Sequence, residues 1–217
     1  MQQSIRLTLE YDGTDFKGWQ IQPDQRTVQG ELQLRLERLY SAPISVIASG
    51  RTDTGVHALG QVVNFTPTRE MPLERLQHSL NGMLPPDIAV KNANYVAPDF
   101  HARFDARRRH YFYRICANKH PIGRYYAWHM HRPLDLDTLK RASNILLGQH
   151  DFTSFCVTAY EKDNRVCELY RCEWHQQGED LTFHIEGNRF LRAMLRSIVV
   201  NIVEMGRVVL TAEAMHD

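Results

Sequence analysis

The feature that most constrains the fold is the order in which strand-like and helix-like patterns follow one another. Ile5, Leu7 and Leu9 alternate with polar residues, which predicts a half-buried strand. Thr27 can cap a helix whose apolar positions recur at helical spacing. The remaining patterns predict a strand at 44–48, a strand at 61–66, a helix from Pro72 that ends before Pro85, and a strand at 88–96. This β-α-β-β-α-β order is typical of ferredoxin-like domains.

The same order begins again after residue 105. It predicts a strand around 111–116, a helix capped by Asp135 and ended by Gly148, strands at 165–174 and 181–187 that turn near Gly178, and a helix over 190–205 ended by Gly206. The sequence stops before a further strand can follow. We therefore expect an α+β fold of two ferredoxin-like or RRM-like halves, residues 1–105 and 106–217, in which the second half is truncated and lacks its final strand.

Composition limits the function classes without choosing one. The 217 residues are sufficient to bury a core, and the formal net charge of +1 neither favours nor excludes a nucleic-acid partner. Four cysteines form no CxxC pair, and Cys167 and Cys172, five residues apart in a strand-like stretch, should point to opposite faces. Buried thiols in a reducing cytoplasm are expected rather than a zinc site or disulfides. No signal peptide or membrane-spanning run is visible.

The segment Gly50–Ala58 reads GRTDTGVHA and places a carboxylate, Asp53, at the tip of a loop. Thr52 and Thr54 can fix this loop by side-chain to backbone hydrogen bonds. A rigid, exposed carboxylate is suited to nucleophilic or acid–base chemistry. The alternative is an Asp that only bonds to its own backbone in a turn. The loop also contains a glycine on each side of the Asp, an arginine and a histidine: Gly50, Gly55, Arg51 and His57.

This loop, continued by the sequence LGQVVNF, resembles the catalytic signature of the tRNA pseudouridine synthase A (TruA) family. The resemblance implies that Asp53 is the nucleophile or general base. Arg51, Thr52 and Thr54 would then contact substrate, and we expect His57 to order the loop rather than transfer protons.

A second segment, 101–111, carries four arginines, two histidines and two aromatic residues. Arginine binds phosphate and aromatic rings stack on unpaired bases, but a charged strand edge that prevents aggregation has similar composition. The segment resembles the family's second motif, which implies that Tyr111 stacks on the target base. Tyr113 is the alternative because it should lie on the same strand face. The phosphate-binding candidates are Arg103, Arg107, Arg108 and Arg109.

A third segment, Asn188–Arg196, resembles the family motif whose last arginine pairs with the catalytic Asp. Arg196 takes that position, and Phe190 lies where the family often has an aromatic residue near the pocket. Arg189, Arg192 and Arg196 have helical spacing and should share one helix face. Asp151–Phe155 also matches a family segment, for which we favour buried packing of Phe152 and Phe155.

The resemblance implies a pseudouridine synthase fold, with a mixed, mostly antiparallel sheet and an RNA cleft between the halves. It implies isomerisation of uridine to pseudouridine in tRNA, at positions 38–40 of the anticodon stem–loop, by a cytoplasmic homodimer without a cofactor. No metal is expected, since His129 and His131 have no carboxylates or cysteines at ligand spacing. Two alternatives stay open: a truncated protein that binds and remodels tRNA without catalysis, and an Asp-based hydrolase.

Overall fold

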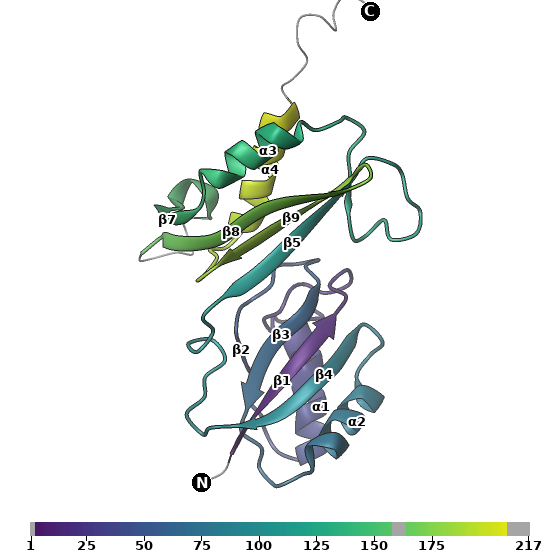
Figure 1. Ribbon diagram of the computed structural model, residues 1–217. Helices are drawn as coiled ribbons and strands as arrows, with labels where there is room; N and C mark the ends of the chain where they lie inside the picture. The colour runs from purple at the N-terminus through teal and green to yellow at the C-terminus, as the bar shows by residue number, and fades with distance from the viewer. Residues whose placement is uncertain (1–2, 158–163, 208–217) are drawn as a thin grey trace, which may run out of the picture. The chain divides into compact units, whose positions relative to one another are not determined.

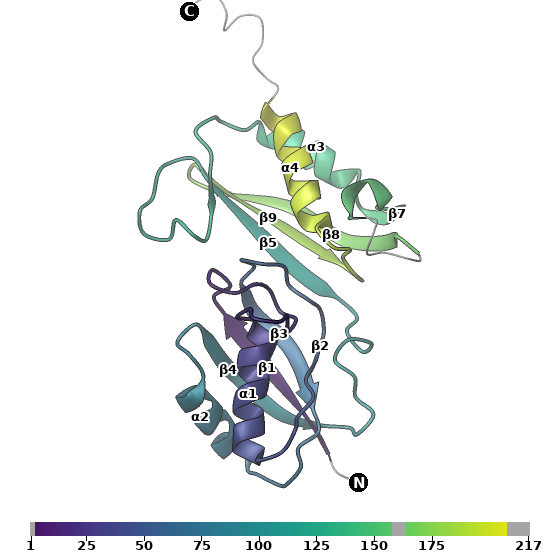
Figure 2. The same cartoon turned by 180° about the vertical axis from the view of Figure 1, so that it is seen from behind.

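The computed structural model describes residues 3–157 and 164–207, and the chain divides into two compact units, Met1–Ala106 and Arg107–Asp217. The first unit has the predicted element order, with strands that form one sheet of order β2-β3-β1-β4 and pair antiparallel throughout. Its elements are β1 (Ser4–Tyr11), α1 (Val28–Tyr40), β2 (Ile47–Ala48), β3 (Ala58–Phe65), α2 (Leu73–Met83) and β4 (Ile88–Val96). Figure 2 shows α1 lying across one face of this sheet.

The core of the first unit lies between the sheet and the two helices. The alternating residues of β1 point to this side, and Leu7 and Leu9 are fully buried. They pack with Leu32 and Leu36 of α1 in one apolar cluster. The Thr27 side chain accepts a hydrogen bond from the Gly30 backbone N–H, so it caps α1 as predicted.

The second unit contains a five-stranded sheet of order β6-β5-β9-β8-β7. Its elements are β5 (Arg109–Cys116), β6 (Trp128–His129), α3 (Leu136–Asn144), β7 (Gly148–Asp151), a short 3-10 turn η1 (Thr153–Phe155), β8 (Val166–Gln177), β9 (Asp180–Gly187) and α4 (Met194–Arg207). Figure 1 shows α3 and α4 on the same side of the sheet. Buried residues of both helices join those of β8 and β9 in one core cluster, and β8 and β9 turn at Gly178 as predicted.

Several predicted boundaries in the second unit are wrong. The helix capped by Asp135 ends at Asn144, and Gly148, with a positive φ of 91°, begins β7 instead of ending the helix. The last helix begins at Met194 rather than near Phe190, because Ala193 has a left-handed φ of 63° that cannot continue a helix. Gly206 lies inside α4, where a Cβ would approach Leu139 Cδ2 of α3 to 2.7 Å. The glycine therefore permits close packing of the two helices.

The outer edge of β5 has limited pairing. Over residues 107–157 and 164–207, the strand that pairs on that edge is β6, which runs parallel and contacts only Ile115 and Cys116. In the first unit, β4 pairs antiparallel with all of β1. The described part of the second unit thus contains no counterpart of β4. Its element order differs from the predicted β-α-β-β-α, because it includes two short edge strands, β6 and β7, that the sequence patterns did not indicate. Within the same residues, no helix combines the length and the apolar character that crossing a membrane requires.

Cys167 and Cys172 both face the core, contrary to the prediction of opposite faces. Their relative exposures are 0% and 4%. The reason is a shift of register between Leu169 and Arg171 in the pairing of β8 with β9. The additional residue of this β-bulge reverses the alternation, so two positions of opposite parity point the same way. Burial raises the pKa of Cys172 to about 12.

Candidate active site

The Asp53 loop joins β2 to β3 and is fixed at its base by side-chain hydrogen bonds. Gln61 Nε2 donates to the Gly50 carbonyl oxygen at 2.6 Å, and Ser49 Oγ donates to Gln61 Oε1 at 2.8 Å. Gln61 is 8% exposed, so this polar contact lies in a nearly buried environment, where a hydrogen bond is costly to lose. Through Gln61, β3 thus anchors Gly50, the first residue of the loop.

Residues 12–19, here called the 12–19 segment, support the loop from the other side. The Trp19 backbone N–H donates to the Thr52 carbonyl at 3.0 Å, and the Gly55 N–H donates to the Phe16 carbonyl at 3.3 Å. The Thr52 hydroxyl lies 2.8 Å from the Tyr11 hydroxyl. The sequence predicted a bond from Thr52 to the backbone, whereas the structure places its hydroxyl against another side chain. Asp53 is therefore flanked by residues held to the 12–19 segment.

Two glycines allow the 12–19 segment to approach this closely. A Cβ on Gly13 would lie 2.1 Å from the Val56 carbonyl oxygen. Gly18 has a positive φ of 87°, and a Cβ there would lie 2.7 Å from the Thr52 carbonyl oxygen. Both contacts are with backbone atoms, which cannot move aside as the end of a flexible side chain could. Sequence patterns did not single out these glycines, although their positions just after a strand, in YDGTDFKGW, are a usable signal.

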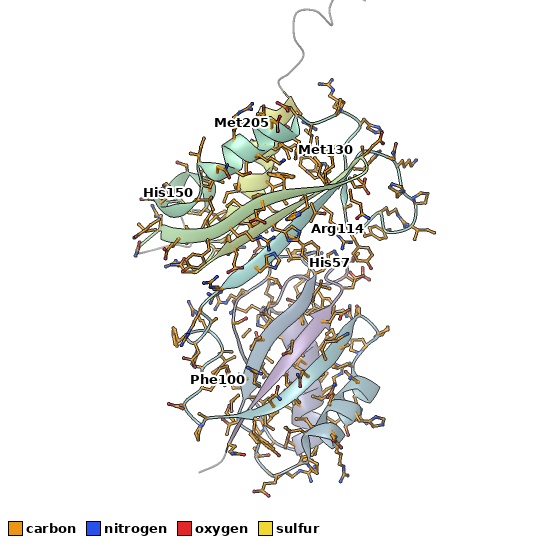
Figure 3. The ribbon with its side chains drawn as sticks, viewed as in Figure 1. His57, Phe100, Arg114, Met130, His150 and Met205 are labelled. Carbon is orange, nitrogen blue, oxygen red and sulfur yellow. The ribbon has the colours of Figure 1, made fainter. Side chains whose placement is uncertain are left out.

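His57 connects the far end of the loop to the 12–19 segment. Its Nδ1 lies 3.0 Å from the Gly13 backbone nitrogen and 2.9 Å from Asp12 Oδ1. Nδ1 accepts from the Gly13 N–H when it carries no proton, and it donates to the Asp12 carboxylate when it does. Figure 3 shows His57 at the end of the first unit's sheet, where the loop lies. Either arrangement orders the loop, the role expected for this histidine.

Asp53 itself is partly exposed, and Arg51 and Thr54 are exposed. The loop therefore presents a carboxylate to solvent from a backbone that is hydrogen-bonded before, beside and after it. Such a group can reach a substrate without a large rearrangement of its own chain.

In the second unit, Tyr111 and Tyr113 lie on the same face of β5, as predicted, and the structure shows that this face is directed toward the core. Both pack partly buried against the second core cluster, while Phe112 between them is exposed. Tyr111 and Phe190 make an edge-to-face contact with ring centroids 5.1 Å apart. Two of the predicted aromatic residues are thus in direct contact.

Arg196 lies near Tyr113. Burial raises the pKa of the Tyr113 phenol, and the positive charge of Arg196 acts against that shift. Tyr111 with Phe190, and Tyr113 with Arg196, thus form two pairs that link the core-facing side of β5 to the residues around the start of α4. The shared helix face predicted for the three arginines is wrong, because Arg189 and Arg192 precede α4, which begins at Met194.

The basic candidates differ in environment. Arg108 donates to Glu186 Oε1 at 2.8 Å, an ion pair that raises the pKa of Arg108. Arg109 Nη1 donates to the Asn188 carbonyl oxygen at 2.6 Å and so connects β5 to the segment before α4. Arg103 and Arg107 are exposed, and the Arg103 guanidinium lies 5.7 Å from the centre of the Phe104 ring. Arg109 is thus partly structural, whereas Arg103 and Arg107 are accessible.

The other candidates have packing roles. Phe152 is 1% exposed and Phe155 packs against the same core, as expected. The rings of His129 and His131 contact each other edge to face, with their centroids 4.3 Å apart. Among the described residues, no group of three or more His, Cys, Asp or Glu side chains is placed to hold a metal ion.

Comparison with known proteins shows which family the chain belongs to. A sequence model of the tRNA pseudouridine synthase family matches residues 8–105 and 142–217. The chain belongs to the tRNA pseudouridine synthase family. Relatives named tRNA pseudouridine synthase A include one from an Exiguobacterium species, 43% identical over 203 residues, which cover 94% of this chain and 82% of the relative. One from Halalkalibacterium halodurans is 45% identical over 205 residues, with 93% and 78% covered.

A third relative of the same name, from Moorella thermoacetica, is 42% identical over 215 residues, which cover 97% of this chain and 87% of the relative. The two matched blocks of the tRNA pseudouridine synthase family contain Asp53 with the 12–19 segment, and Arg196 with Phe190. The stretch between the blocks, residues 106–141, contains Tyr111 and the loop that follows β5.

Proposed function

We propose that this protein isomerises uridine to pseudouridine in tRNA. The observation that carries the proposal is Asp53, a partly exposed carboxylate on a loop fixed by Gln61 and by the 12–19 segment. This loop lies in the first block matched by the tRNA pseudouridine synthase family.

The reaction requires a nucleophile or base but no change of oxidation state. The N1–C1′ glycosidic bond breaks, the uracil turns, and C5 bonds to C1′. C5 then loses its proton and N1 gains one, so atoms and electrons balance within the substrate. No cofactor is needed for this sequence of steps. Asp53 acts on the sugar or the base as nucleophile or general base.

Other residues support Asp53 in this proposal. Arg196 supplies positive charge that keeps a carboxylate ionised. Tyr111 stacks on the uracil after it leaves the helix, since the reacting atoms are inaccessible in a stacked duplex. Arg103 and the arginines at 107–109 bind phosphates, with Arg107 the more available of the latter because Arg108 and Arg109 have protein partners.

The position of the target uridine, the oligomeric state and the cellular location are inferred from the family resemblance. The target is uridine on the 3′ side of the anticodon stem–loop, at tRNA positions 38–40. The active form is a homodimer in the cytoplasm.

The decisive experiment replaces Asp53 with Asn and maps pseudouridine chemically in unmodified tRNA after incubation with each protein. Asp53→Asn keeps the shape of the side chain but removes its basicity, so product formation should vanish while tRNA affinity stays within about threefold of wild type. Asp99→Asn, at an exposed position of the same unit, is the matched control and should retain activity.

Two results would contradict the proposal. Normal turnover by Asp53→Asn would show that Asp53 only braces its loop. A wild-type protein that binds tRNA and forms no pseudouridine would support the alternative of a protein that binds tRNA without catalysis.

A further inference from the structure

The net positive charge of this chain comes from one stretch. The whole sequence holds 26 Lys and Arg against 25 Asp and Glu. Residues 106–134 contain seven Lys or Arg residues and no Asp or Glu, so the rest of the chain is net acidic. This stretch covers β5 and the segment after it, and it lies between the two blocks that match the family. A near-neutral protein thus contains a local site for a polyanion.

The centre of this stretch is an exposed loop, residues 118–126, in which all nine residues are exposed. Figures 1 and 2 both show the segment between β5 and α3 extending away from the sheet. A turn closed by the Tyr126 N–H and the Gly123 carbonyl, at 2.9 Å, gives the loop its shape. It therefore has a defined conformation that adds nothing to the core of its unit.

The exposed side chains of the 118–126 loop include aromatic and basic types, which are the types that proteins use to bind unpaired RNA. Tyr125 is 60% exposed, Tyr126 is 48% exposed and Ile122 is 94% exposed. The Arg124 guanidinium lies 4.2 Å from the centroid of the Tyr125 ring and donates to the Tyr125 hydroxyl at 2.6 Å. Aromatic rings stack on bases and basic side chains bind phosphates, whereas a core-forming role would bury these residues.

We propose that the 118–126 loop is a second tRNA contact, in which Tyr125 and Tyr126 stack on unpaired bases while Lys119 and Arg124 bind the adjacent phosphates. Ala117, where the loop departs, follows Tyr111 by six residues along β5, a distance of about 20 Å at the rise of a strand. The loop therefore binds nucleotides other than the uridine held by Tyr111. This inference rests on the proposed function for its tRNA substrate.

The test measures tRNA affinity directly and kinetics separately. Tyr125→Ala combined with Tyr126→Ala should raise both the Kd and the KM for unmodified tRNA by about fivefold or more while kcat stays within about twofold. Lys119→Gln and Arg124→Gln should each reduce the slope of log Kd against log salt concentration by about 0.7–0.9. Backbone footprinting should show lost protection at nucleotides other than the target.

Matched controls come from the first unit. Tyr95→Ala alters a tyrosine of similar exposure, 45%, and Lys91→Gln removes an exposed lysine that pairs with Glu10. Both should leave tRNA affinity within about twofold of wild type, as expected for side chains outside the contact. Circular dichroism melts check that every variant is folded.

Unchanged tRNA affinity in the loop variants would overturn the inference, and unchanged affinity with an altered sedimentation mass would assign the loop to contact between protein copies. Wild-type protein that does not bind tRNA would overturn it as well. If wild type binds tRNA but forms no pseudouridine, the proposed function fails alone, since the loop variants still show whether they weaken binding.

Discussion

Gly13 lies so close to Val56 that a single added carbon would collide with the Val56 carbonyl oxygen at 2.1 Å. The two residues are far apart in sequence, and their contact brings the 12–19 segment against the Asp53 loop. Because the opposing atom belongs to the backbone, a side chain at position 13 must displace one segment or the other. The geometry of the proposed catalytic carboxylate therefore depends on the absence of a side chain at this position.

Gly13→Ala should lower pseudouridine formation by about tenfold or more, because even a small misplacement of a reacting group is costly. The overpacked backbone should also reduce the free energy of unfolding by about 1–3 kcal/mol. Turnover, tRNA affinity and urea unfolding together check this result.

The control for that change is Gly82→Ala. Gly82 lies in α2, and a Cβ there would meet no atom within 4 Å. Alanine should stabilise the helix by about 0.5–1 kcal/mol without altering turnover. Equal activity in the Gly13 and Gly82 variants would show that the close contact does not govern the loop.

Tyr111→Phe should keep tRNA affinity and lose rate, whereas Tyr111→Ala should lose both. Stacking is worth about 1–3 kcal/mol per base, and phenylalanine retains it while removing the hydroxyl. The alanine variant also removes the contact with Phe190. Steady-state kinetics and equilibrium binding separate the two effects. Wild-type behaviour of both variants would exclude stacking by Tyr111, and Tyr113 would become the candidate.

Arg196→Met should reduce turnover much more than tRNA affinity, because it removes the charge proposed to face Asp53. The same change removes the positive charge that lowers the pKa of Tyr113, so the phenol should ionise at higher pH. Ultraviolet titration of tyrosinate in Arg196→Met and Arg196→Lys tests this second effect, and lysine should preserve the wild-type titration. A uniform loss of affinity with unchanged kcat would identify Arg196 as a phosphate contact.

Alkaline pH should destabilise the fold through Cys172. Burial raises the pKa of its thiol from about 9 to about 12, so between these values the unfolded chain has lost a proton that the folded chain still holds. Stability from this group is complete below about pH 9 and falls by up to about 1.4 kcal/mol per pH unit above it. Urea unfolding of wild type and Cys172→Ala at several pH values measures the difference, and parallel curves would contradict the burial argument.

The element order of the first unit and the place of the Asp53 loop between two strands could be predicted because they depend on local patterns, whereas the short strands β6 and β7 of the second unit were missed. The catalytic and binding roles of the site candidates stay predictions. The alternation of Ile5, Leu7 and Leu9 and the cap at Thr27 are both found in the structure. The helix predicted from Phe190 failed for a local reason that periodicity does not encode. Leu191 and Met194 have helical spacing, but the left-handed backbone of Ala193 separates them from a common helix.

The supports of the site could not be predicted, because they depend on contacts between distant segments. Nothing in the pattern around Asp53 indicates that Tyr11 bonds to Thr52 or that Asp12 and Gly13 meet His57. Similarly, Cys167 and Cys172 were assigned to opposite faces because strict alternation was assumed along the whole strand, whereas a β-bulge between Leu169 and Arg171 changes the parity of the buried positions.

All four cysteines belong to the second unit, at positions 116, 156, 167 and 172, and the bulge in β8 turns two of them inward. Thiol-specific labelling is therefore a natural probe of one half of this molecule. The slow modification of Cys167 and Cys172 would time the opening of that unit's core, while the first unit, which contains no cysteine, contributes no signal. Labelling rates measured with and without tRNA would show whether tRNA binding reduces the opening of the second unit, which carries Tyr111 and Arg196.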